Sequence, residues 1–412
     1  MSLDFYKSLN IKTWLEQHLP FDLNYLPPSS YLVGGIIRDI LLKRTKNYLD
    51  LDFIIPNNAI EIAYNIARIY HAGYVVLDDK RDIARVVFSD VICDFAQQDG
   101  LTIKQDLQRR DFTINSIAYS LKDSLICDPN QGLIDLNNNL IRMISKKNLK
   151  DDPLRLLRAY RQASQLNFNI EDMTRNALKE LSWTLKTTAG ERVKSEINYI
   201  LSSSSGSYWL KLAYEDQIFK YWLPSATADK VSLLSKIDGF ALEISADFKI
   251  DISFSLALTK LAILLSSTVK NAQRELTNLK ASRAEMKLIL TALEKLYFLS
   301  NNQIDLTLRD QYFLFLEAKD SFVILTLLCL AFNIYSSQIK TLLVRYFDPS
   351  DPLAHPKPLI TGKTLLENLD IRPGPIIGKL LTEIQIAYLE GKIQTKAEAL
   401  NFAKERKLLE NN

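Results

Sequence analysis

Cysteine and histidine are scarce in this sequence. Its three cysteines, Cys93, Cys127 and Cys329, are scattered and odd in number. This excludes a disulfide framework and a cysteine-based zinc site, and it favours a reducing compartment. None of the three histidines is followed by an aspartate, which excludes a fused metal-dependent phosphohydrolase domain.

Long apolar runs and a strong net charge are also missing. The longest apolar run, Phe322 to Phe332, is shorter than the roughly 20 residues of a membrane helix, so we expect a buried helix and no membrane partner. The N-terminus has early acidic residues and no signal-peptide pattern, which predicts a cytoplasmic protein. A net charge of +3 means that any RNA contact must come from local basic patches.

A glycine pair opens the stretch that carries most of the functional information. Tyr31 to Val33 predicts a short strand, Gly34 and Gly35 a tight turn, and the residues after them a helix bearing Arg38. A double glycine before a helix lets a triphosphate approach backbone N–H groups at the start of that helix. Alone, however, a glycine pair is usually only a turn.

Two aspartates stand on the next predicted strand, Tyr48 to Ile55. Asp50 and Asp52 are two residues apart, so their side chains share one face of the strand. Close carboxylates repel each other unless a cation lies between them, and Mg²⁺ suits such ligands together with a substrate phosphate. An Asp-x-Asp alone is usually a solvated face. Its combination with the glycine turn and Arg38 predicts a nucleoside-triphosphate site with metal-assisted chemistry.

Charged residues further along the chain are candidates for the same site. Asp94, on a later predicted strand, is a candidate third metal ligand, although a surface strand residue explains it equally well. Arg110 next to Asp111 suits a phosphate clamp held by a neighbouring carboxylate, whereas a charged helix face is the plainer explanation.

From Asp151 onward the apolar residues recur at helical spacing, with an acidic start and a proline in the first turn. Arg155, Arg158 and Arg161 recur every three residues and form one basic stripe. Asp152 lies one turn before Arg155, so an intrahelical salt bridge is one interpretation of this pair.

Base selection is the alternative interpretation of Asp152 and Arg155. An aspartate accepts hydrogen bonds and an arginine donates them. Cytosine and adenine present an amine beside a ring acceptor, whereas guanine and uracil present a carbonyl in place of the amine. A fixed pair of this kind would admit C and A and reject G and U.

The pattern as a whole predicts an α+β protein. Short β-rich runs fill the first third, and a helical pattern follows. Within the later part, Ser282 and Glu285 form a capping box at a predicted helix start. The residues expected on the buried face of that helix are Met286, Ile289, Leu290, Leu293 and Tyr297.

Five motifs occur in an order that resembles one known superfamily. The motifs are GGIIRD at Gly34–Asp39, LDLDF at 49–53, RRDFTINSIAY at Arg109–Tyr119, DPLRLLRAYR at Asp152–Arg161 and ERVKSE at Glu191–Glu196. Together they resemble the class II CCA-adding tRNA nucleotidyltransferase and bacterial poly(A) polymerase superfamily. The C-terminal stretch from Leu359 to Leu381 resembles the tail of the tRNA-adding members.

The resemblance implies an architecture and a set of residue roles. It implies a catalytic head at residues 1–145, a neck with the nucleotide-selecting helix at 146–206, a helical body at 207–346 and a tRNA-binding helical tail at 347–412. Asp50 and Asp52 would bind two Mg²⁺ ions, which activate the 3′-hydroxyl and stabilise the leaving pyrophosphate, and Arg110 would assist catalysis. The implied nucleotide-binding residues are Gly34, Gly35, Arg38, Arg110, Asp111, Asn115, Asp152, Arg155, Arg158 and Arg161.

The resemblance also implies substrates and partners. CTP and ATP would be added to tRNA without a nucleic-acid template, with the acceptor and T arms held through phosphates and shape. Full CCA-adding members carry a longer mobile segment between the strand bearing Asp94 and the RRD motif, whereas only Ala96 to Gln105 lies there in this chain. Members with this segment shortened resemble enzymes that add only CC and leave the terminal A to a separate enzyme. The sequence therefore favours CC addition.

Three alternatives remain at this point. The chain could add the full CCA end if another segment replaces the shortened one. A poly(A) polymerase shares most head motifs, but the tail and the lack of a strongly basic extension speak against it. A non-catalytic RNA-binding protein is disfavoured because both aspartates and all the arginines are present.

Overall fold

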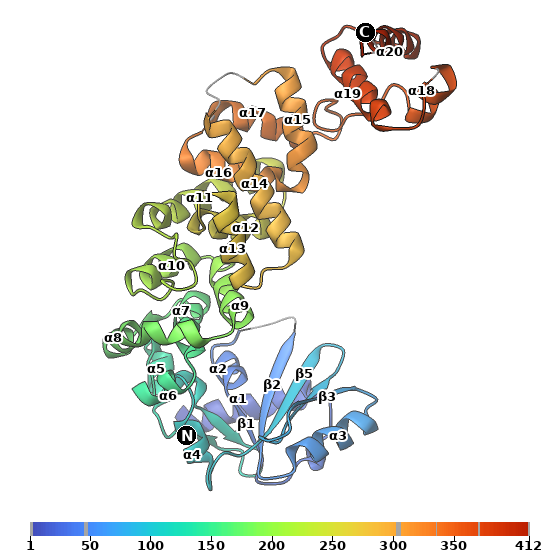
Figure 1. Ribbon diagram of the computed structural model, residues 1–412. Coiled ribbons are helices and arrows are strands. Elements are labelled where there is room, and N and C mark those ends of the chain that lie inside the picture. Colours follow the sequence, from blue (N-terminus) through green and yellow to red (C-terminus); the bar gives the residue numbers. More distant parts are fainter. Residues whose placement is uncertain (1–2, 45–47, 302–305, 335, 370, 411–412) are drawn as a thin grey trace. The chain divides into compact units, whose positions relative to one another are not determined.

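The computed structural model describes residues 3–44, 48–301, 306–334, 336–369 and 371–410, and they fall into two units, Met1–Tyr221 and Trp222–Asn412. The first unit combines a β-sheet with helices, and the second is helical (Figure 1). The structure thus confirms the α+β class. The finer division at residues 145, 206 and 346 stays a prediction.

Seven strands in the described part of the first unit form one mixed sheet in the order β3-β4-β5-β2-β1-β6-β7. Only β2 and β5 pair in parallel, and the other neighbours are antiparallel. The strands are β1 Tyr31–Val33, β2 Leu49–Ile55, β3 Gly73–Asp78, β4 Ile83–Val87, β5 Val91–Gln97, β6 Ala118–Ser120 and β7 Ile126–Cys127. The strands predicted at Tyr31–Val33, at Tyr48–Ile55 and around Asp94 are confirmed.

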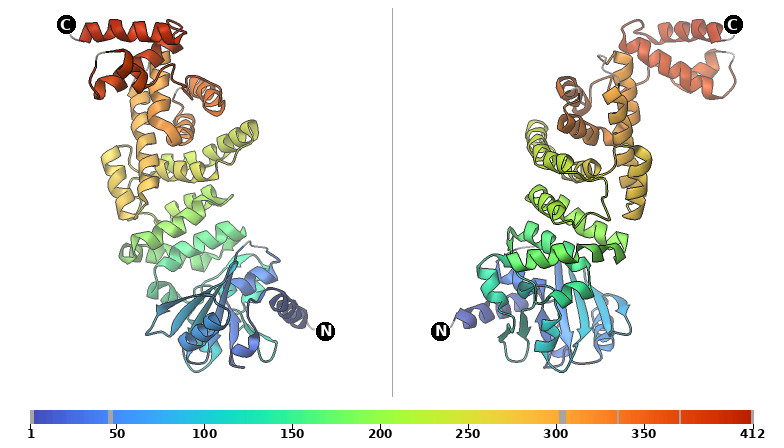
Figure 2. Two further views of the ribbon diagram at one scale, coloured as in Figure 1. Left: turned by 90° about the vertical axis from the view of Figure 1, so that its right-hand side faces the viewer. Right: turned by 60° about the vertical axis from the view of Figure 1, so that its left-hand side comes forward.

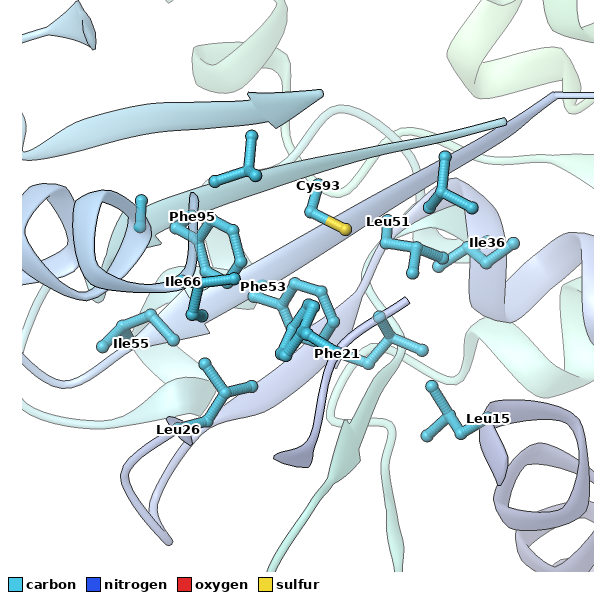
Figure 3. Close-up of a cluster of buried hydrophobic side chains, with 14 of the residues drawn as sticks. Leu15, Phe21, Leu26, Ile36, Leu51, Phe53, Ile55, Ile66, Cys93 and Phe95 are labelled. Carbon is cyan, nitrogen blue, oxygen red and sulfur yellow. The ribbon is translucent and has the colours of Figure 1, made fainter. Parts of the chain in front are cut away.

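The β2–β5 register places aspartates on one face of the sheet and phenylalanines on the other. Asp52 lies beside Asp94, and Phe53 lies beside Phe95. The two phenylalanine rings stack with centroids 5.3 Å apart, and Phe21 packs on both of them (Figure 3). Because alternate side chains of a strand face opposite ways, this packed face fixes the aspartates on the other one.

Ten helices accompany the described strands of the first unit. They are α1 Leu3–His18, α2 Gly35–Leu41, α3 Ala59–Ile69, α4 Ile103–Gln108, α5 Gly132–Asn137, α6 Lys146–Asp151, α7 Leu154–Leu166, α8 Asp172–Leu181, α9 Gly190–Leu201 and α10 Gly206–Glu215. Figure 2 shows helices α7 to α10, in green, stacked beside the blue sheet. Helix α7 packs against both α9 and α10, so the arginine-bearing helix is held from two sides.

The second unit consists of helices, and one of them, α16, contains the longest apolar run of the sequence. The helices are α11 Ala228–Phe248, α12 Ser253–Leu264, α13 Val269–Asn278, α14 Arg283–Asn301, α15 Leu308–Ala318, α16 Phe322–Phe332, α17 Ser336–Phe347, α18 Gly362–Asn368, α19 Pro375–Leu389 and α20 Lys396–Glu410. Every α16 residue from Phe322 to Ala331 is buried, which confirms the expected buried helix. Among the described residues, no single helix has the length and apolarity to cross a membrane, although the bent pair α12–α13 passes this test by length and composition together.

Several details differ from the sequence predictions. The expected capping box is present, with Ser282 N–H donating to Glu285 and Glu285 N–H to Ser282, but Tyr297 on the same helix is 65% exposed. Helix α14 packs against α12, α13, α15 and α16, and these contacts leave the Tyr297 side chain open to solvent. The sequence from Asp128 to Ile144 predicts a turn-and-strand closure of the first domain, and this prediction is wrong. Residues Gly132–Asn137 form helix α5, and β8 Leu140–Ile141 pairs with β9 Asn169–Ile170 outside the seven-stranded sheet. A short strand therefore lies within the region expected to be helical throughout.

Candidate active site

The glycine turn lies where β1 meets α2, beside the aspartate-bearing face of the sheet. Gly34 has φ +79°, which an L side chain rarely adopts. A Cβ atom added there would lie 3.1 Å from Nη1 of Arg110 and 3.2 Å from Oδ2 of Asp52. The backbone therefore favours glycine at this position, and a side chain there would press on both Arg110 and Asp52.

Alanine at position 34 should lower activity more than stability. The backbone at φ +79° and ψ −141°, a region almost restricted to glycine, should cost roughly 1–3 kcal/mol of unfolding free energy. The added methyl group should displace Arg110 or Asp52 and reduce nucleotide addition at least about 10-fold. Gly391→Ala is the matched control, because Gly391 has φ +76° with no atom within 4 Å of the added Cβ. Thermal unfolding and primer extension check both variants. Equal activity in the two alanine variants would contradict the role of this turn.

The two aspartates differ in their surroundings. Asp50 is exposed and Asp52 is partly buried. Burial raises the pKa of the Asp52 carboxyl to about 6; Arg110 opposes this rise, while Asp94 and Asp50 add to it. The negative charge at this edge of the sheet is thus incompletely compensated by the protein.

A divalent cation fits the donor set of this pair. The described residues contain no group of three or more histidine, cysteine, aspartate or glutamate side chains arranged to hold a metal. Two carboxylates on one strand face supply hard oxygen ligands and leave the remaining positions for water or substrate phosphate, which is how Mg²⁺ is usually bound at such sites.

Asp94 has a different partner. Both of its carboxylate oxygens accept hydrogen bonds from Arg85, at 2.7 and 2.8 Å, and this pairing raises the pKa of Arg85. A metal ion could bind Asp94 only through the lone pairs that the Arg85 hydrogen bonds leave. Its role as a third ligand stays a prediction, and the Arg85 pair favours the alternative of a structural strand residue.

The residues of the RRD motif separate in the structure. Nη2 of Arg110 lies 3.6 Å from Asp106, one turn earlier on α4, whereas the Asp111 carboxylate lies 2.9 Å from Nε of Arg158 on α7. The expected pairing of Arg110 with Asp111 is therefore wrong, because adjacent side chains at the end of a helix point in different directions. The Nε atom of Arg110 is buried without a hydrogen-bond partner in the described structure, and its guanidinium faces the glycine turn.

Asp111 instead organises the wall between the sheet and α7. It accepts hydrogen bonds from the Phe112 N–H at 2.8 Å and from the Asn115 amide at 3.0 Å. Burial alone raises the pKa of Asp111, but Arg158, Asn115 and the Phe112 N–H together hold it below its usual value. This carboxylate stays ionised and fixes Arg158.

Gln162 is a site residue that the sequence interpretation missed. Its Oε1 accepts hydrogen bonds from the Asn115 amide at 2.9 Å and from Arg38 at 3.4 Å. Arg38 also donates to Asn115 Oδ1 at 2.8 Å and to Asp39. Gln162 is buried, and a polar residue one turn after Arg158 on a largely apolar helix face was the signal that could have revealed it.

Asp152 and Arg155 do not form the intrahelical salt bridge. Asp152 pairs with Arg192 of α9 at 3.2 Å, and Arg155 donates to the backbone oxygens of Arg109 and Asn148, both at 2.9 Å. Each side chain is therefore held in place by a partner outside its own helical turn. The plainer interpretation of this pair is wrong, and the base-selecting interpretation stays a prediction.

Glu196 is a second missed residue, although its motif was recognised. Its carboxylate lies 2.6 Å from Nε of Arg161. Burial raises the pKa of Glu196 and lowers that of Arg161, so each group needs the other to remain charged. The Arg161 guanidinium also lies over the Tyr199 ring, 5.4 Å from its centroid.

These side chains converge on one cavity of about 370 Å³. All predicted catalytic and nucleotide-binding residues line it, and Asp94 does not. Its full lining is Gly34, Gly35, Ile36, Arg38, Leu49, Asp50, Asp52, Arg110, Asp111, Asn115, Asp152, Arg155, Arg158, Arg161 and Gln162. Five arginines beside four aspartates suit a ligand that combines a triphosphate, a metal ion and a polar base.

Known proteins match almost the whole chain. Residues 30–142 match the family model described as the poly A polymerase head domain, 167–230 that of the probable RNA and SrmB-binding site of polymerase A, and 253–403 that of tRNA nucleotidyltransferase domain 2, putative. A CC-adding tRNA nucleotidyltransferase of Synechocystis sp. is 45% identical over 403 residues, covering 95% of this chain and 97% of the relative. The chain belongs to the tRNA nucleotidyltransferase family.

Other members of the tRNA nucleotidyltransferase family match at lower identity. A CCA-adding enzyme of Leuconostoc mesenteroides is 29% identical, covering 91% of this chain and 92% of the relative. The fold matches the structure of the Thermotoga maritima CCA-adding enzyme complexed with tRNA, with a TM-score of 0.71 and 24% identity over 92% of this chain and 91% of that one. As a family member the protein is an enzyme, and both CC-adding and CCA-adding enzymes are among its relatives.

Proposed function

We propose that this tRNA nucleotidyltransferase is a CC-adding enzyme. It transfers CMP from CTP to the 3′-hydroxyl of tRNA that lacks its CCA end, releases pyrophosphate, uses Mg²⁺ and works without a nucleic-acid template. The observation that carries this proposal is the single cavity that joins the paired aspartates to the Asp152–Arg155 pair. The reaction takes place in the cytoplasm, and a separate enzyme adds the terminal A.

Different residues of the cavity bind the metal ion, the triphosphate and the base. Asp50 and Asp52 would hold Mg²⁺, which would supply activation of the attacking hydroxyl and charge stabilisation for the leaving pyrophosphate. Arg38 and Arg110 neutralise charge on the triphosphate as it develops in the transition state. Asp152 and Arg155 accept from and donate to the edge of the incoming base, and their outside partners keep them from turning toward a wrong base.

The connection between β5 and α4 supports CC addition over full CCA addition. It comprises the five residues 98–102 between Gln97 and Ile103. Gln98 N–H donates to Ile55 O at 2.8 Å, Asp99 N–H to Asp106 at 3.0 Å and Leu101 N–H to Gln105 at 2.7 Å. A short segment with three of its five backbone N–H groups tied in this way is poorly suited to act as a lever that widens the pocket from C to A.

Primer extension at single-nucleotide resolution tests the proposal. Purified protein is incubated with tRNA lacking CCA, Mg²⁺, and CTP alone, ATP alone or both. We expect two C residues and then arrest, even with ATP present. Extension to CCA would make the protein a full CCA-adding enzyme, and a long A tail would make it a poly(A) polymerase. No extension with retained tRNA binding would indicate a non-catalytic RNA-binding protein.

A further inference from the structure

A second cavity adjoins the first at Asp50. It has a volume of about 440 Å³ and shares Arg38, Asp50 and Arg161 with the first cavity. Its own walls include Arg44 after α2 and Tyr199 on α9. Asp50 is therefore accessible from two hollows that contain different side chains.

Nucleotidyl transfer requires two substrates at these carboxylates. The attacking hydroxyl approaches the phosphorus in line with the leaving group, so it must come from the side opposite the pyrophosphate. The first cavity contains the groups that suit a triphosphate and its base. The second cavity borders the same aspartate and remains for the acceptor.

Tyr199 is unusual among the walls of this second cavity. Its side chain is 51% exposed, although it lies beside a network of buried charges. The Arg161 guanidinium lies over the ring, 5.4 Å from the centroid, and Glu196 fixes that guanidinium in turn. The ring is thus braced by a cation on one side while much of its surface is open to the solvent.

We propose that Tyr199 is the stacking platform for the 3′-terminal base of the acceptor RNA, with Arg44 as a contact for its backbone phosphate. This inference rests on the proposed function. The terminal base changes between the first and the second addition, so its site must accept different bases. Stacking on an aromatic ring meets this need because every base has a π-face.

Arg44 fits the phosphate role by its position and exposure. Its side chain is exposed, and its Nη1 donates to the backbone oxygen of Gln165 at 3.0 Å. No other hydrogen bond of this guanidinium is found among the described residues, so its remaining donors are available at the edge of the cavity. A positioned arginine of this kind suits a phosphate oxygen of the acceptor strand.

Steady-state kinetics distinguishes a role of Tyr199 in binding the acceptor RNA from a general disturbance of the active site. Tyr199→Ala should raise KM for tRNA about 10-fold or more, as expected for one lost base stack, and leave KM for CTP within about twofold. Tyr199→Phe should restore most of the tRNA affinity, because stacking needs the ring and not the hydroxyl. The matched control is Tyr208→Ala, since Tyr208 is 58% exposed on α10 and lines neither cavity.

A fluorescent acceptor gives a readout that does not depend on catalysis. A tRNA minihelix without CCA carries 2-aminopurine as its last base, whose emission is quenched by stacking. We expect quenching on binding to the wild type and to Tyr199→Phe, and its loss in Tyr199→Ala. Arg44→Ala should keep the quenching but lower the salt dependence of minihelix binding by about 0.7 in log–log slope, as for one phosphate contact.

The outcomes separate this inference from the proposed function. Failure of the wild type to extend tRNA would overturn the proposed function. Normal extension by the wild type, with unchanged KM for tRNA and unchanged quenching in Tyr199→Ala, would overturn the stacking role alone. An equal rise of both KM values in Tyr199→Ala would also overturn it, because that pattern indicates a general disturbance of Arg161.

Discussion

Asp52→Asn should abolish nucleotide addition and at the same time stabilise the metal-free protein. Loss of one of the two metal-binding carboxylates should lower kcat at least about 1,000-fold, or roughly 4 kcal/mol in activation free energy. Single-turnover extension of tRNA with CTP and Mg²⁺ measures this loss. Retention of more than a tenth of the wild-type rate would contradict the assignment of Asp52.

The stability gain follows from the pKa of Asp52, which burial raises from 3.8 to about 6. A raised carboxyl pKa means that the folded state binds the proton more tightly than the unfolded state. The charged form therefore penalises folding above about pH 6, and the penalty disappears as the pH falls towards 4. Asparagine removes it, so we expect a gain of roughly 2–3 kcal/mol at pH 8 in EDTA and almost none at pH 4.

Asp50→Asn is the matched control for this double effect. Asp50 stands on the same strand face but is exposed, so its substitution should abolish activity without the pH-dependent gain in stability. Thermal unfolding can be followed by tryptophan fluorescence, because Trp14, Trp183 and Trp209 lie in the first unit and only Trp222 lies in the second. A similar gain in stability in both variants would show that the charge of Asp52 is not what destabilises the folded protein.

Asp152→Ala should relax the choice of base more than it weakens catalysis. A site that pairs with a specific edge rejects wrong partners because its own polar groups are then left unpaired. Without the acceptor at position 152, CTP loses one hydrogen bond and UTP no longer faces a repelling carboxylate. We expect the ratio of kcat/KM for CTP over UTP to fall about 100-fold or more.

Two further variants test how Arg155 and Arg192 contribute to the selection of the base. Arg155→Ala should relax selection in the same way, because Arg155 supplies the donor of the pair. Arg192→Ala should lower selectivity less, since Arg192 only orients Asp152, at 3.2 Å. Competition assays with radiolabelled CTP and UTP on tRNA lacking CCA provide the ratios. Unchanged ratios in Asp152→Ala would contradict the base-selecting role.

The local sequence was sufficient to predict structural features that depend on a single strand or a single helix. The period-two alternation around Asp50 and Asp52 predicted their common face, because a packed aromatic layer must occupy the other face. The expected glycine turn, the capping box at Ser282 and the buried helix at Phe322–Phe332 rest on interactions within a few residues. Such features follow from backbone geometry and hydrophobic burial alone.

Local pattern failed where partners come from distant segments. It paired Arg110 with Asp111 and Asp152 with Arg155, whereas the structure joins Asp111 to Arg158 and Asp152 to Arg192. Sequence neighbours are near each other along the chain, but the direction of a side chain depends on the helix that presents it. The same limitation hid Gln162 and Glu196, whose roles arise only when α7 packs against the sheet and α9.

The sequence by itself determined the family, the α+β class and the residue types of the nucleotide site, because ordered motifs, periodicity and composition are properties of the chain. Only the tertiary structure decided which charges neutralise one another and that one cavity joins strand β2 to helix α7. It also placed Tyr199 of α9 in a second cavity that shares Asp50 with the first. The physical reason is that electrostatic pairing and burial depend on distances in space, which the β-sheet register and helix packing fix and the order of residues does not.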